Sequence, residues 1–120
     1  MPDIRINKLR NRLTVFFHRQ VPSHVPAFVQ KLEAACQALV PGFICLAVIP
    51  IDGFGRQGDR DFFIHTTDLI AAYGARKMVC VRAAGRVRRG HLVPIPVSLQ
   101  SRMPVKQAAD LKEAENRMRE

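Results

Sequence analysis

Apolar positions in the first third of the chain follow two different spacings. Residues 4–9 and 12–18 are short runs rich in β-branched and aromatic side chains, and Asn11 between them tolerates left-handed turn geometry. These features predict a β-hairpin. Residues 25–39 instead place apolar side chains three and four positions apart, which predicts an amphipathic helix with Ser23 as its N-cap.

The middle of the chain has the pattern of a βαβ unit. Residues 43–49 and 77–83 are nearly continuous apolar runs, which are typical of parallel strands buried on both faces. Between them, residues 59–73 carry apolar side chains at helical spacing. Asp59 complements the positive end of the helix dipole, and Gly74 ends the helix.

The last third of the chain is more varied. Residues 93–97 hold two alternating prolines, which predict an edge strand or an extended arm because proline cannot donate to a sheet. Residues 104–120 are helical by propensity, and this helix either docks on the domain or frays. We therefore predict one α/β domain over residues 1–103, with the order β-β-α-β-α-β, a mostly parallel sheet and helices packed on it, followed by the C-terminal helix.

Composition and charge narrow the class of protein only partly. The chain has 120 residues, enough for one core, and a net charge of +9. Such a charge favours polyanions, anionic membrane surfaces or acidic proteins as partners, or simply keeps the protein soluble. The three cysteines, Cys36, Cys45 and Cys80, form no CxxC pair. Together with the lack of an apolar leader or spanning segment, they predict a reduced, cytoplasmic protein without a membrane partner.

The glycine-rich turn after the third predicted strand suggests a ligand site. Gly53, Gly55 and Gly58 match G-x-G-x-x-G between a strand and a helix. A dinucleotide site would place an acidic residue at the end of the next strand, where this chain has Arg82. We therefore predict no cofactor and interpret the motif as a surface turn.

A concentration of positive charge follows the fourth predicted strand. Its basic residues can contact phosphate oxygens and predict, as an alternative function, binding of nucleic acid or a phosphate ligand. The residues of this alternative anion site are Arg82, Arg86, Arg88, Arg89 and His91. Few aromatic residues are interleaved with them, and a solvated basic loop explains the same pattern.

Residue types that commonly act in catalysis are scattered along the sequence. His18, His24, His65 and His91 show no metal-ligand spacing with cysteine or carboxylate, and no cysteine lies in a nucleophile signature. The sequence therefore predicts no metal site and no enzyme.

The element order and the glycine turn resemble the STAS domain, the anti-sigma factor antagonist fold of bacterial-type regulators. The turn 51–55 is similar to that family's Asp-Ser-Ser-Gly turn, and residues 74–81 are similar to its glycine-then-strand continuation. The resemblance implies a non-catalytic regulatory or protein-interaction domain. Gly53 and Phe54 stand where the family has its two serines, so the resemblance also implies that the phospho-switch is lost, with Thr66 and Thr67 as poor substitutes.

The resemblance directs attention to the turn and the start of the second predicted helix. Arginine and aromatic side chains contribute strongly to protein interfaces, and Phe54 is an apolar residue within a polar turn. We expect the partner to be another protein or a second copy of this chain. The predicted partner-binding residues are Asp52, Phe54, Arg56 and Arg60.

Overall fold

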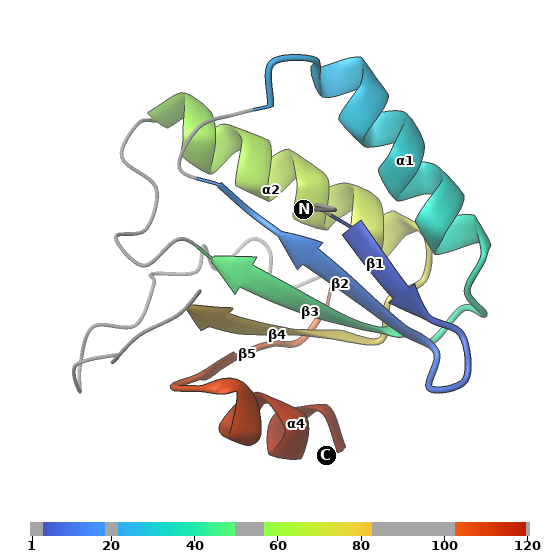
Figure 1. Ribbon diagram of the computed structural model, residues 1–120, viewed down its shortest axis with the longest axis vertical. Helices are drawn as coiled ribbons and strands as arrows, with labels where there is room; N and C mark the ends of the chain where they lie inside the picture. Colours follow the sequence, from blue (N-terminus) through green and yellow to red (C-terminus); the bar gives the residue numbers. More distant parts are fainter. Residues whose placement is uncertain (1–3, 19–21, 50–56, 83–102, 120) are drawn as a thin grey trace.

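The computed structural model describes residues 4–18, 22–49, 57–82 and 103–119 and shows a small α/β fold (Figure 1). Its strands form one sheet in the order β1-β2-β3-β4-β5, in which β1 is antiparallel to β2 and the other neighbours are parallel. The predicted fold class is confirmed. In chain order the elements are β1 (Ile4–Asn7), β2 (Arg12–Phe16), α1 (Val25–Gln37), β3 (Ile44–Ile49), α2 (Gln57–Ala72), β4 (Lys77–Arg82), β5 (Val105–Ala108) and α4 (Leu111–Arg119).

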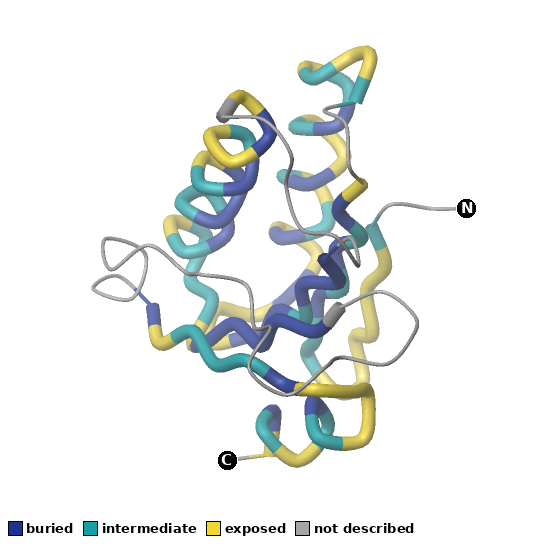
Figure 2. The backbone as a smooth tube through the Cα atoms, turned by 90° about the vertical axis from the view of Figure 1, so that its left-hand side faces the viewer, coloured by how far each residue is buried: buried dark blue, intermediate teal, exposed yellow. Residues whose placement is uncertain are grey.

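The central strands are covered on both faces of the sheet. Successive side chains of a strand point to opposite faces, and nearly every described side chain of β3 and β4 is buried. Helices α1 and α2 lie over one face, and α4 lies over the other (Figures 1 and 2). This two-sided burial explains why the sequence of these strands is continuously apolar rather than alternating.

The face beneath α1 and α2 holds the larger apolar cluster. Leu13, Cys45 and Met78 are paired across neighbouring strands and are fully buried on this face. Leu32 of α1 and Ile70 of α2 pack against them from above and are also fully buried. Burial of a side chain of this size contributes about 1.5–3 kcal/mol, so the apolar stripe of each helix determines which side faces the sheet.

The opposite face holds a smaller apolar cluster under α4. Val79 and Val81 of β4 lie beside Ala108 of β5, and Ala114 and Met118 of α4 pack on them. The C-terminal helix is therefore docked in this structure.

Two polar contacts also hold α4 against the sheet. Lys77 is only 5% exposed, and its ammonium group donates a hydrogen bond to the backbone carbonyl of Arg117 at 2.6 Å. That carbonyl lies in the last turn of α4, where the helix dipole favours a positive charge. Arg12 of β2 donates to both carboxylate oxygens of Glu115, at 2.9 and 3.0 Å.

Three loops at the amino end of the parallel strands are joined by short-range contacts. Asn11 has a left-handed backbone (φ 54°), and its side-chain amide exchanges two 2.9 Å hydrogen bonds with the backbone of Val40. The backbone amide of Gly42 donates to the carbonyl of Gly74 at 2.7 Å. A Cβ atom on Gly74 would lie 3.1 Å from the Cβ of Pro41, so glycine permits this close approach.

The structure corrects the predicted N-cap of α1. The helix begins at Val25, so the capping position falls on His24 and not on Ser23. Nδ1 of His24 accepts a hydrogen bond from the backbone amide of Ala27 at 3.1 Å. Ser23 lies one position too early for this geometry.

The predicted helix over 104–120 is wrong in its first part. Residues 105–108 form β5, and α4 begins only at Leu111. Lys106 and Gln107 favour helix by propensity, but β4 offers an edge of backbone donors and acceptors that β5 satisfies in parallel register. The predicted edge strand or arm at 93–97 lies outside the described residues.

Substitution of Asn11 tests the joined loops. We expect Asn11→Ala to lower the free energy of unfolding by about 2–3 kcal/mol. The alanine makes neither side-chain hydrogen bond, and it disfavours the left-handed backbone conformation at this position. Asn11→Gly restores the backbone preference and costs about 1 kcal/mol less. Denaturant unfolding followed by circular dichroism measures both, with Lys8→Ala in the same turn as a near-neutral control. Equal losses for the Ala and Gly variants would contradict a role for the left-handed backbone.

Candidate functional site

The start of α2 is the part of the predicted partner-binding surface that the structure describes. Arg60 lies in the first turns of α2 and is exposed. Gly58 borders open space, since a Cβ atom built on it would meet no atom within 4 Å. Asp59, in contrast, is only 8% exposed and lies in the first turn, where its charge complements the helix dipole. Asp52, Phe54 and Arg56 lie outside the described residues, so their placement beside Arg60 remains a prediction.

An aromatic cluster joins α2 to α1 and to the end of β2. Phe17 follows directly after β2, and its ring packs edge-on against Phe63 of α2 with centroids 5.0 Å apart. Phe62 of α2 packs against Phe28 of α1 at 5.3 Å and against Phe17 at 6.4 Å. Aromatic contacts of this kind contribute about 0.5–1.5 kcal/mol beyond area burial. These contacts pack the first half of α2 against α1 and against the residue that follows β2.

The alternative anion site is described only at its first residue. Arg82 is the last residue of β4, beside Ile49 of β3 in the parallel register. Arg86, Arg88, Arg89 and His91 lie outside the described residues. Their convergence on a phosphate group therefore stays a prediction from sequence.

The three cysteines act as packing residues. Cys36, Cys45 and Cys80 are all buried in the cluster beneath α1 and α2. Burial raises the pKa of Cys36 to about 11 and that of Cys80 to about 12, with the Glu33 carboxylate adding to the effect at Cys36. Burial, and then the neighbouring Cys80 and Cys36, raise the pKa of Cys45 well above its usual range. The thiol is the stable form at each position, whereas nucleophilic and metal chemistry require thiolate.

The described histidines lie on three separate segments of the fold. His24 caps α1, His18 follows β2 and His65 is exposed on α2. Within the described part of the chain, no three His, Cys, Asp or Glu residues are grouped so that they could hold a metal ion.

The two threonines considered as substitutes for the missing serines are inside the protein. Thr66 and Thr67 are buried, and the hydroxyl of Thr67 donates to the backbone carbonyl of Ile64 at 2.9 Å. A phosphate group at either hydroxyl would require α2 to move away from the sheet.

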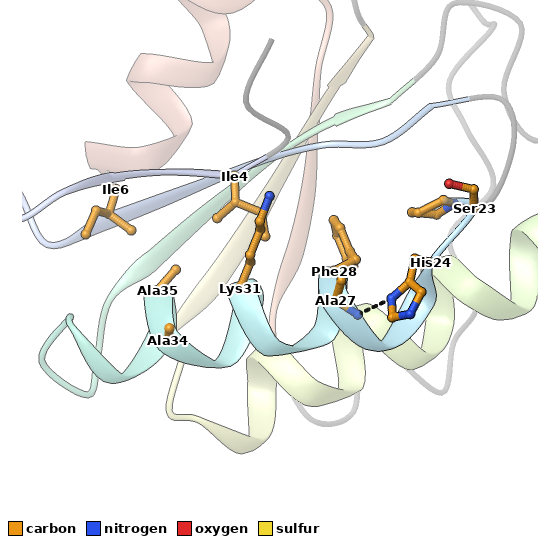
Figure 3. A pocket seen from close by; sticks show the side chains of 10 residues that line it. Ile4, Ile6, Ser23, His24, Ala27, Phe28, Lys31, Ala34 and Ala35 are labelled. Atoms are coloured by element: carbon orange, nitrogen blue, oxygen red, sulfur yellow. Dashed lines mark hydrogen bonds between the residues drawn. The ribbon is translucent and has the colours of Figure 1, made fainter.

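The structure contains a groove between α1 and the edge strand β1 that is not predicted from the sequence. It has a volume of about 490 Å³ and is lined by the side chains shown in Figure 3. Ile4 and Ile6 approach it from β1, whereas Lys31 and Ala35 approach it from α1. The signal available in the sequence was the pair of alanines Ala34 and Ala35, whose small side chains leave space on a helix next to a hairpin.

Comparisons with known proteins do not assign the chain to a class. No protein-family model, curated protein or solved structure matches it. In the described residues, no helix has both the length and the apolar character needed to cross a membrane.

The thiols predict a loss of stability at alkaline pH. Because Cys80 holds its proton more tightly when folded, its contribution to stability is complete below its usual pKa of 9.0 and is lost as pH rises toward about 12. Between pH 8 and pH 10.5, the free energy of unfolding should fall by about 2 kcal/mol more in wild type than in Cys80→Ala. Urea unfolding in reductant at the two pH values measures this difference. Parallel losses in both proteins would show that Cys80 ionises normally in the folded state.

Proposed function

We propose that this chain is a regulatory, protein-interaction domain of STAS-like type, without catalytic activity and without the phosphorylation switch of that family. The observation that supports the proposal is the element order. β1, β2, α1, β3, α2 and β4 follow one another as the resemblance implies, and the sheet is parallel except at β1. This order sets the corner between β3 and α2 at the carboxyl edge of the sheet, where open α/β folds place their contacts.

The proposed partner surface consists of Asp52, Phe54 and Arg56 in the turn and Arg60 on α2. Arg60 and its neighbour Asp61 are exposed, while the aromatic cluster on the inner side of α2 holds the helix on the sheet. A firmly held helix presents its exposed side chains with little loss of entropy when a partner binds. The partner is another protein or a second copy of the chain.

The alternative is binding of nucleic acid or a phosphate ligand through Arg82, Arg86, Arg88, Arg89 and His91. Net charge of +9 supports it, since neutralised phosphates contribute most of such binding. The two hypotheses differ in the residues that they need and in their dependence on salt.

Variants of the turn and of α2 test the proposal. We expect Phe54→Ala and Arg60→Glu each to weaken partner binding about tenfold or more, because each removes an anchor of the interface. Affinity capture with quantitative mass spectrometry identifies the partner, and native mass spectrometry detects self-association. Lys112→Glu, a charge reversal at another exposed helix position on α4, is the matched control.

Two outcomes would contradict the proposal. One is identical capture and self-association by wild type, Phe54→Ala and Arg60→Glu. The other is binding to DNA or RNA that falls steeply with salt and is lost on replacing Arg86, Arg88 and Arg89, which would support the alternative function.

A further inference from the structure

Among the described strands, β1 lies at the edge of the sheet. β1 is the end of the strand order, and in the described residues it pairs only with β2. A strand in this position presents backbone donors and acceptors that another extended segment can pair with. The four residues of β1 offer a short pairing edge, so side-chain contacts are needed to add affinity and specificity.

Those contacts are available in the groove next to the same edge. Figure 3 shows the side chains of Ile4 and Ile6 directed from β1 toward α1, where Ala34 and Ala35 leave space. The volume of about 490 Å³ lies within the usual range for ligand pockets, about 300–1,000 Å³. A strand added to β1 would direct every second side chain into this groove.

Exposed apolar side chains gather around the same hairpin. Among the described residues, four large apolar side chains are exposed, and Ile6 (39%), Leu9 (100%) and Val40 (68%) are three of them. Val40 is tied to the hairpin turn that contains Leu9 through the side chain of Asn11. These side chains lie on β1 and at the adjoining hairpin turn, and exposed apolar patches are typical of binding sites.

Charge selects the kind of segment that fits. Between Asp3 and Glu33 the chain has no acidic residue and six basic ones. Arg5 lies over the ring of Phe16 at 5.2 Å, on the face of the sheet opposite α1, and Lys31 rises from α1 toward Ile4 (Figure 3). A second copy of β1 paired antiparallel about Arg5 would set the two Arg5 side chains opposite each other, which disfavours self-pairing in that register.

We propose that β1 and the groove beside it bind an extended segment of another protein in which apolar and acidic residues alternate. The segment adds to the sheet as a further strand next to β1. Its apolar side chains enter the groove beside Ile4 and Ile6, and its carboxylates lie on the opposite face near Arg5. The site is separate from the start of α2, so it does not depend on the function proposed above.

A synthetic peptide of alternating Glu and Val, about eight residues long, tests this site with the full chain. We expect fluorescence anisotropy to show saturable binding and NMR shift changes to centre on β1 and α1. A Lys-Val peptide of the same pattern should bind at least about tenfold more weakly, because its charges repel Arg5. A Glu-Val peptide N-methylated at alternate nitrogens should also lose at least about tenfold, because it cannot complete the strand pairing.

Protein variants separate the groove from general charge effects. Ala34→Trp fills the groove from an exposed helix position and should abolish binding of the Glu-Val peptide, whereas Ala72→Trp on α2 should leave it within about twofold. Arg5→Glu should weaken binding about tenfold, and Lys112→Glu on α4 should not. Arg60→Glu should also leave it unchanged, which distinguishes this site from the start of α2. Thermal unfolding confirms that each variant is folded.

Several results would overturn the proposal. Absence of saturable binding by the Glu-Val peptide is one, and equal binding of its N-methylated form or by folded Ala34→Trp is another. A concentration-dependent dimer that Ala34→Trp disrupts would assign the groove to a second copy of the chain instead.

Discussion

Burial of β3 and β4 on both faces is the constraint on which the rest of this structure depends. Parallel strands in the middle of a sheet expose no face to water, so each face needs a covering layer. The two long helices supply one layer, and the short helix α4 supplies the other with a small apolar stripe and two polar contacts. In the described structure, α4 is the helix that covers the apolar side chains of Ile44, Val48, Val79 and Val81.

This arrangement also determines where the protein can act. The described interior is occupied by packing side chains, and the thiols that might otherwise serve chemistry are part of that packing. What the described structure leaves accessible are the ends and the open edge of the sheet. The start of α2 lies at one such end, and β1 with its groove forms the edge. Both are open surfaces rather than enclosed cavities.

The sequence predicted those elements whose pattern is dictated by local packing. The apolar stripe of α1 and the continuous runs of β3 and β4 were placed correctly, because two-sided burial leaves few choices at these positions. The strand β5 was missed because Lys106 and Gln107 favour helix, and the pairing that overrides them comes from β4, far away in the sequence. Similarly, Ser23 was chosen as a cap by residue type, whereas the helix begins one residue too late for it.

The candidate site could be predicted only in part. Arg60 was expected to be exposed from its place on the outer side of a helix, and it is. The groove is lined by Ile6 of the hairpin and Ala34 of α1, which are far apart in the sequence. A short-range sequence pattern therefore does not predict it. The positive charge is evident in the sequence, but only the fold places Arg5 and Lys31 on opposite sides of the β1 edge.

Amide hydrogen exchange on the dilute, peptide-free protein tests the central claim most directly, namely that the middle of the sheet is sealed on both faces while its β1 edge is open. The account predicts that the amides of β3 and β4 exchange only with global unfolding. It predicts that the β1 amides directed away from β2 exchange far faster, alternating with slower ones paired to β2. Uniform protection of β1 at the level of β3 would show that the edge is already covered and would contradict the account.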